Sequence, residues 1–298
     1  MRGEAVTDTY FTAAPSIDAV LPDEIAKRCE RTGAGKTRLE TTRLLMLAIL
    51  AGAFIAFGGM FSTIAASAAG GMPFGIMRIV SGVAFSLGLI LVVLGGAELF
   101  TGNNLMVMAW AARKATGRAI VRSWALVYVG NFVGAAATAG LVFLSGLHEQ
   151  GDGAVGATAL ATLQAKATLP FLTALVSGIL ANVLVCLAVW LSYGARTMTD
   201  KILVVVPPTA AFAAAGFEHS VANMYLIPYG LLVKDGADAA FWSQIGQGTQ
   251  AFSEIGWRAL WTNLVPVTLG NMIGGGVLVG AVYWFVYLRR SPELEEEG

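Results

Sequence analysis

The stretch "AGFEHSVANMY", residues 215–225, interrupts a run that otherwise has the length and composition of a membrane span. The apolar segment "KILVVVPPTAAFAAA" (201–215) precedes it and "MYLIPYGLLV" (224–233) follows it. A carboxylate such as that of Glu218 costs about 2.5 kcal/mol or more at the centre of a bilayer. Irregular backbone at that depth survives only where it is buried in protein or lines a cavity. The stretch therefore predicts a helix that breaks inside the membrane, beside a path through the protein.

Composition places the whole chain among membrane proteins. The 298 residues are 56% hydrophobic and only 13% charged, with a formal net charge of zero. Soluble domains usually contain about 25% charged residues, so a protein with several membrane spans is favoured. The sequence has no long basic tract, so nothing in it suggests nucleic acid as a partner. Cys29 lies in a polar segment and Cys186 in an apolar one, which argues against a disulfide framework.

Apolar stretches long enough to cross about 30 Å of hydrocarbon predict an all-α fold with six spans. We expect these spans near residues 42–68, 74–112, 119–147, 168–195, 201–233 and 259–288. The second is too long for one crossing and contains "GGAELFTGNN" (95–104), so it should be broken like the fifth. The organisation is then an N-terminal segment (1–40) with an amphipathic helix near 16–32, a six-helix channel domain (41–290) and an acidic tail (291–298).

Lysine and arginine placement predicts the orientation of the spans. If the N-terminus is cytoplasmic, the outer side keeps only Arg78, Lys166, Lys234 and Arg258 out of 19 basic residues. Basic residues concentrate on the cytoplasmic side of membrane proteins. Both termini are therefore expected in the cytoplasm.

Two motifs recur in the same order in both halves of the chain. Glu98 and Glu218 each begin an E-x4-N pattern, and "GNFVGAAATAG" (130–140) matches "GNMIGGGVLVG" (270–280) as GN-x2-G-x5-G. Three spans per half require the second half to be inverted across the membrane. Inverted repeats with interrupted helices are typical of transport proteins. Coincidence among small residues, which membrane helices favour for packing, is the alternative.

Polar residues at membrane depth are the candidate functional groups. His219 is the foremost, because a histidine inside a span is a functional hypothesis by default; the alternative is that it only hydrogen-bonds a broken helix end. Glu98 and Glu218 are expected to hold the breaks in shape, and Asn131 and Asn271 to tie neighbouring helices to them. Lys166, just before the fourth span, either snorkels or attracts anions to a pore mouth.

Catalysis has little support in the sequence. A metal site built on Glu98, Glu218 and His219 would need further histidine, cysteine or carboxylate ligands, and the spans contain almost none. No nucleophile motif, phosphate loop or cofactor fingerprint is present. A membrane-embedded metalloenzyme therefore remains only as an alternative of a different class, and we expect neither enzymatic activity nor a cofactor.

Four segments carry a resemblance to a known family. "GFEHSVANMYLIP", "AELFTGN", "GILANVLVCLAVW" and "LVPVTLGNMIGGG" resemble the formate/nitrite transporter family, over residues 18–290 or so. Within the family, "MPFGIMRIVSGVAFSLGLILVV" and "IPYGLLVKDGADAAFW" are most similar to the formate-channel branch. The run "ELFTG" followed by asparagine is instead similar to nitrite-type members.

The resemblance implies an aquaporin-like fold with an inverted 3+3 repeat, in a homopentamer with one pore per protomer. It implies that His219 is the central pore histidine, with Thr101 as its partner on the opposite broken helix. An unperturbed pKa of about 6.5 suits histidine to a proton relay, and orientation of the solute is the alternative role. The remaining residues that it implies are Lys166, Asn182 and Asn223 for substrate, Phe85, Leu89 and Phe212 for an outer constriction, and Leu99, Phe100 and Val185 for an inner one.

The resemblance also implies a function and a location. The expected function is passive or proton-coupled movement of formate across a bacterial inner membrane, with membrane lipid around the protein. Nitrite and hydrosulfide are the alternative substrates within the same family.

Overall fold

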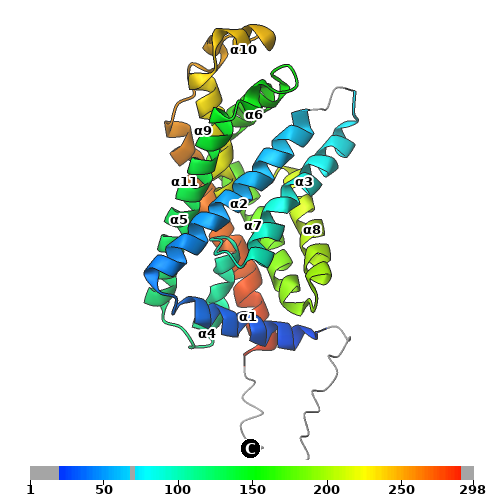
Figure 1. Ribbon diagram of the computed structural model, residues 1–298. Coiled ribbons are helices and arrows are strands. Elements are labelled where there is room, and N and C mark those ends of the chain that lie inside the picture. The colour runs from blue at the N-terminus through cyan, green and yellow to red at the C-terminus, as the bar shows by residue number, and fades with distance from the viewer. Residues whose placement is uncertain (1–19, 68–70, 290–298) are drawn as a thin grey trace, which may run out of the picture.

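The computed structural model describes residues 20–67 and 71–289, and every regular element in those ranges is helical (Figure 1). In chain order the elements are α1 (Pro22–Lys36), α2 (Thr41–Ser67), α3 (Phe74–Gly95), the 3-10 helix η1 (Gly102–Met106), α4 (Val107–Ala111), α5 (Gly117–Leu144), η2 (Leu147–Glu149), α6 (Ala154–Ala167), α7 (Phe171–Gly194), α8 (Met198–Ala215), α9 (Ser220–Gly236), α10 (Ala239–Gln244), η3 (Thr249–Phe252), α11 (Arg258–Met272), the π-helix η4 (Ile273–Ala281) and α12 (Val282–Tyr287).

Within the described ranges, six helices are long and apolar enough to cross a membrane, as the sequence predicts. They are α2, α3, α5, α7, α8 and the continuous α11–η4–α12 rod, Arg258–Tyr287. Their bounds lie within a few residues of the predicted ends, apart from the second and fifth spans. Those two are divided, because α3 ends at Gly95 before η1 and α8 ends at Ala215 before α9.

A left-handed glycine ends the helix on the N-terminal side of each break. Gly96 has φ of 69° and Gly216 has φ of 76°, a region that only glycine enters without strain. The residue after each glycine then donates its N–H to a carbonyl five residues back, from Ala97 to Val92 and from Phe217 to Phe212, both at 3.0 Å. This is the usual hydrogen-bond pattern of a glycine-terminated helix, and it appears identically in both halves.

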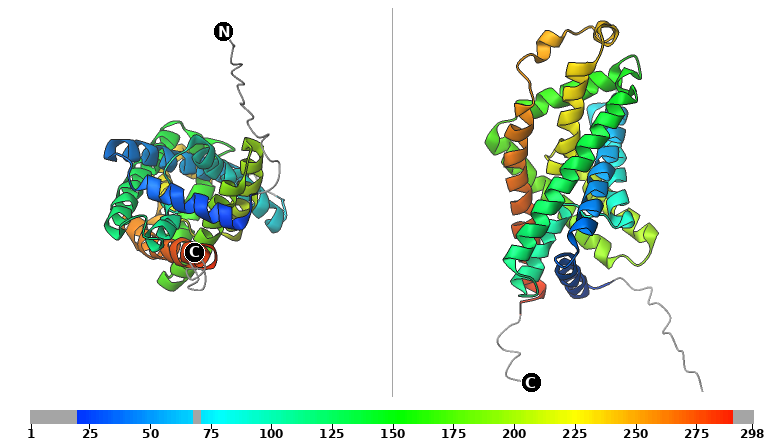
Figure 2. Two further views of the ribbon diagram at one scale, coloured as in Figure 1. Left: turned by 90° about the horizontal axis from the view of Figure 1, so that it is seen from below. Right: turned by 60° about the vertical axis from the view of Figure 1, so that its left-hand side comes forward.

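Short helices cover the two ends of the bundle. The helix α1 runs across the end where α12 finishes, and α6 and α10 lie at the opposite end (Figures 1 and 2). The amphipathic helix expected at 16–32 is α1, which begins later because Pro22 stands in its first turn, a position that favours proline. Residues 16–19 and the acidic tail 291–298 lie outside the described residues. The sequence analysis did not predict α6 or α10.

The GN-x2-G motifs allow two pairs of helices to approach closely. A Cβ at Gly134 of α5 would collide with the carbonyl oxygen of Ile49 on α2. A Cβ at Gly274 would likewise collide with the carbonyl oxygen of Ile179 on α7. The last glycine of the first motif, Gly140, has open space instead. Close backbone approach at small residues is the main way in which membrane helices pack, so the first part of the motif is structural.

Gly134→Ala is expected to destabilise the folded protein by about 1–3 kcal/mol, the usual cost of overpacking a well-filled contact. The same methyl group at Gly140 meets no atom within 4 Å, so Gly140→Ala serves as the matched control. Thermal unfolding of both variants in detergent tests the difference. Equal melting temperatures for the two variants would contradict the close contact between α2 and α5.

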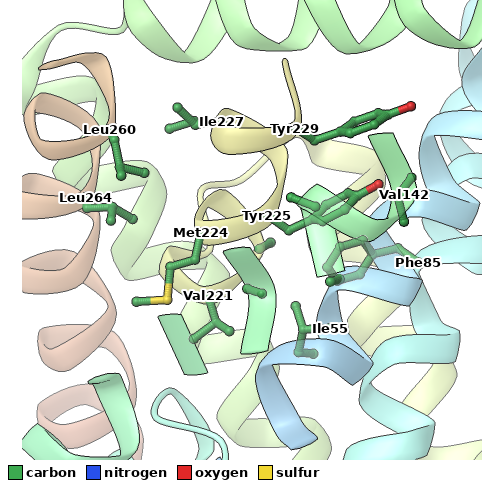
Figure 3. Close-up of a cluster of buried hydrophobic side chains, with 14 of the residues drawn as sticks. Ile55, Phe85, Val142, Val221, Met224, Tyr225, Ile227, Tyr229, Leu260 and Leu264 are labelled. Atoms are coloured by element: carbon green, nitrogen blue, oxygen red, sulfur yellow. The ribbon is translucent and has the colours of Figure 1, made fainter. Parts of the chain in front are cut away.

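The second half-helix of the fifth span, α9, lies at the centre of the hydrophobic core. Figure 3 shows side chains of α9 surrounded by residues of α2, α3, α5 and α11. Tyr225 and Tyr229 are almost fully buried, with parallel rings whose centroids lie 5.5 Å apart. Both cysteines are free and buried, and burial raises the pKa of the Cys29 thiol to about 12, so this thiol stays protonated.

Candidate functional site

The two breaks meet inside the protein through a pair of polar side chains. Thr101 lies just before η1, and His219 lies just before α9. The hydroxyl oxygen of Thr101 is 3.0 Å from Nε2 of His219, although 118 residues separate them in the chain. Thr101 is fully buried and His219 is 2% exposed. The structure thus brings together the two residues that the family resemblance assigns to the centre of the path.

The second ring nitrogen of His219 has a structural partner. His219 is the N-cap residue of α9, and its Nδ1 accepts the backbone N–H of Ala222 at 3.0 Å. A side-chain acceptor at this position satisfies one of the free N–H groups at a helix start. Because Nδ1 accepts a hydrogen bond, it carries no proton in this conformation, and the single proton of the neutral ring is on Nε2. Nε2–H therefore donates toward the Thr101 hydroxyl.

Asn131 of α5 holds the first break. Its Nδ2 donates to the carbonyl oxygens of Ala48 at 2.7 Å and Glu98 at 2.9 Å. Its Oδ1 accepts the backbone N–H of Phe100 at 2.9 Å. A single buried amide thus satisfies two backbone groups of the break, as buried polar groups require, and ties them to the carbonyl of Ala48 in α2.

Asn271 of α11 makes the equivalent contacts at the second break. Its Nδ2 donates to the carbonyl oxygens of Gly178 at 2.7 Å and Glu218 at 3.0 Å. Its Oδ1 accepts the backbone N–H of Ser220 at 2.9 Å. The asparagines of the two GN motifs therefore have the same bonding pattern in the two halves of the chain.

Glu218 is neutralised by Lys166, for which the sequence left two roles open, snorkelling and attraction of anions to a pore mouth. The Nζ atom of Lys166, in the last turn of α6, lies 2.8 Å from Oε1 of Glu218. The other carboxylate oxygen accepts from Asn223 at 2.6 Å and from Asn263 at 3.4 Å. The side chain of Lys166 is only 12% exposed, so Lys166 is neither a snorkelling residue nor a free surface charge.

Glu98 has an equivalent set of partners, and one of them was missed in the sequence. Its Oε2 accepts from Asn103 at 2.8 Å and lies 3.1 Å from Nζ of Lys36. Lys36 also donates to Oδ1 of Asn103 at 2.7 Å. Spacing in the sequence could have indicated that Lys36 corresponds to Lys166. Lys36 ends α1 five residues before α2 begins, and Lys166 stands five residues before the start of α7.

The outer vestibule is a cavity of about 160 Å³ on the α6 side of His219. Several waters fit in such a volume. Its lining includes Lys166, Asn223, His219 and the two aromatic residues of the predicted outer constriction. The rings of Phe85 and Phe212 meet edge to face at 5.4 Å, and Phe212 stacks on the imidazole of His219 at 5.6 Å.

The inner vestibule is a second cavity, of about 180 Å³, at the end of the bundle covered by α1. Lys36, Glu98, Leu99 and Asn103 contribute to its lining. Neither lining includes Thr101, and only the outer one includes His219. The two vestibules are therefore separated by buried protein, in which the Thr101–His219 contact lies.

The candidate constriction residues are all buried, but their surroundings differ. The predicted set Phe85, Leu89, Phe212, Leu99, Phe100 and Val185 belongs to one buried hydrophobic cluster. Phe100 packs edge to face against Tyr128 at 5.0 Å and Trp124 at 6.2 Å, both on α5. Leu89, Phe100 and Val185 line neither vestibule.

Asn182 is also fully buried and lines neither vestibule. Its Nδ2 donates to the carbonyl oxygens of Asn271 at 2.7 Å and Thr101 at 3.3 Å, and to Oδ1 of Asn104 at 2.8 Å. The amide therefore links the first break to Asn271, the residue that holds the second break.

Sequence comparison agrees with this architecture. The sequence profile described as Formate/nitrite transporter matches residues 23–285. The chain belongs to the formate/nitrite transporter family. The formate channel FocA of Escherichia coli (strain K12) is 44% identical over 275 residues, which cover 92% of this chain and 96% of that protein. The formate channel FocA of Haemophilus influenzae is 39% identical and covers 88% of this chain and 93% of the relative.

Solved structures of family members share the fold. A pentameric formate channel with formate bound superposes with a TM-score of 0.79 at 39% identity, covering 84% of this chain and 98% of that one. An FNT family ion channel gives a TM-score of 0.73 at 27% identity, covering 88% and 98% of the two chains. Because the family and these neighbours are channels and transporters, the metalloenzyme alternative is not supported, and the protein is not an enzyme.

Proposed function

We propose that this protein is a homopentameric channel that moves formate across the bacterial inner membrane, with one path in each protomer. The Thr101–His219 contact carries the proposal, because it places polar groups in the dry region between two vestibules that each contain a lysine. The formate channels named above and the formate-bound pentamer support the choice of substrate and assembly.

Formate crosses the dry region as the neutral acid. The idealised cost of moving a bare carboxylate from water into a low-dielectric protein interior is on the order of 20 kcal/mol, and relaxation of the protein reduces it to several kcal/mol. Formic acid resembles a chain-terminal carboxyl, with a pKa of roughly 3.5, so protonation at pH 7 costs about 5 kcal/mol. Beyond the outer constriction, where Phe212 packs against Phe85 and stacks on His219, protonation is the less costly alternative.

His219 orients the solute rather than relaying the proton through its ring. A relay through neutral imidazole needs one nitrogen to give a proton while the other receives one. The Nδ1 atom faces the backbone N–H of Ala222, which is not a source of protons. Nε2–H remains available as a hydrogen-bond donor, and the Thr101 hydroxyl as its partner. The proton that accompanies formate therefore comes from water in the vestibule.

Orientation follows the distribution of basic residues. The end of the bundle that carries α1 and α12 contains most of the lysines and arginines, and both termini are assigned to the cytoplasm by this rule. The vestibule next to α6 then faces the outside.

Uptake by purified protein in liposomes tests the function. Formate, nitrite, acetate and hydrosulfide are supplied separately at two pH values, and internal pH is recorded with each. We expect formate to enter fastest, with one proton per formate and a higher rate at the lower pH. Nitrite entering faster than formate would transfer the assignment to the nitrite branch, and no uptake of any of these solutes would overturn the channel function.

A further inference from the structure

Neither Lys166 in the outer vestibule nor Lys36 in the inner one supplies net charge, since each is paired with a buried carboxylate. Lys166 lies 2.8 Å from Glu218, and Lys36 lies 3.1 Å from Glu98. An ion pair this close has no net charge, and its remaining dipole field falls off with distance faster than the field of a single charge. Some other group is needed if the vestibules are to attract an anion from solution.

One more cationic side chain lines each vestibule. Arg78 of α3 contributes to the outer lining, and Lys201 of α8 contributes to the inner one. Both stand near the start of the helix that leads to a break. Among the described residues, no carboxylate forms an ion pair with either of them.

The guanidinium of Arg78 is fixed beside the second break, at the end of α8. Its Nε donates to the carbonyl oxygen of Ala214 at 2.6 Å, and its Nη2 donates to that of Ala213 at 3.3 Å. These carbonyls end α8, where the helix dipole places partial negative charge. Uncharged partners fix the position of the guanidinium without cancelling its full positive charge.

We propose that Arg78 in the outer vestibule and Lys201 in the inner one provide the net positive charge that draws a monovalent carboxylate into the path. The proposal rests on the function proposed above, because it names the residues that attract its substrate. Lys166 and Lys36 then act at short range, where their remaining N–H groups meet the anion. The low-dielectric walls of a vestibule focus the electric field of such a charge and raise the local concentration of counter-ions.

The electrostatic potential of a vestibule is measurable without transport. A cysteine at Thr162 reports on the outer vestibule and one at Ser192 on the inner, since both residues line the respective cavities and bond only within their own helices. The reaction rate of a sulfonate-bearing methanethiosulfonate is divided by that of its trimethylammonium analogue. The native cysteines are buried, and the parent chain gives the background rate.

Arg78→Gln is expected to lower this anion-to-cation ratio at Thr162→Cys by about five- to fifteenfold at low ionic strength. Arg78→Lys should keep the ratio near that of the Arg78 parent, because it keeps the charge. The paired removal Lys166→Gln with Glu218→Gln should also keep it, because it deletes both signs. Lys201→Gln should lower the ratio at Ser192→Cys in the same way, with Lys201→Arg as its charge-keeping partner.

Arg258→Gln and Arg118→Gln are the matched controls, because both arginines are exposed at the corresponding ends of the bundle and line neither vestibule. The outer assignment would be overturned by an unchanged ratio in Arg78→Gln, or by an equal drop in Arg258→Gln. The inner assignment would be overturned by an unchanged ratio in Lys201→Gln, or by an equal drop in Arg118→Gln. The reporter needs no transport, whereas formate uptake by the unmodified protein tests the proposed function. The two failures are therefore distinguishable.

Discussion

His219→Asn is expected to slow formate uptake about ten- to hundredfold, while each formate still enters with one proton. Asparagine is a good N-cap residue, so it preserves the acceptor that Ala222 N–H requires. Its side chain is shorter, so it has no donor that reaches Thr101 as Nε2–H of His219 does. A buried polar group left without its hydrogen-bond partner costs about 1–3 kcal/mol, and each 1.4 kcal/mol corresponds to about a tenfold change.

Internal pH recorded together with formate uptake in liposomes decides the role of the ring. An asparagine variant that loses acidification per formate, although it assembles normally, would show that His219 relays the proton. His219→Phe is the companion variant, since it fills the ring volume but has neither the cap acceptor nor the donor. We expect it to abolish uptake, and coupled uptake at the normal rate in this variant would exclude both roles.

Asn271→Leu is expected to prevent accumulation of folded protein, although leucine has a similar volume. The change leaves two buried backbone groups at the break without their partner, the N–H of Ser220 and the carbonyl of Glu218. It also removes a second donor from the carbonyl of Gly178 inside α7. Each such loss costs about 1–3 kcal/mol. The sum is comparable with the lower end of the total stability of about 5–15 kcal/mol of a typical folded protein.

Thr262→Val is the matched control on the same helix, because the Thr262 hydroxyl bonds only to carbonyls of α11. Size-exclusion profiles and melting temperatures of both variants in detergent check the prediction. A wild-type profile and melting temperature for Asn271→Leu would mean that other contacts hold the second break.

The sequence predicts the spans and breaks well because these features depend on local composition. An apolar run of about twenty residues spans a bilayer whatever lies beside it, and glycine near a polar cluster marks a place where the helix stops. The same pattern points to His219, Glu98 and Glu218, since polar residues in such runs require partners. It does not predict α6, because a helix of 14 residues is too short to give the hydropathy signal of a membrane crossing.

What the sequence by itself determined is therefore the family, the six spans and the location of the polar residues at the breaks. Only the tertiary structure decided which partners the charged residues have. The pairing of Lys36 with Glu98 and the two carbonyls of α8 that Arg78 contacts join segments far apart in the chain. The physical reason is that periodicity specifies which face of a helix is apolar, whereas ion pairs and caps depend on how separate helices approach.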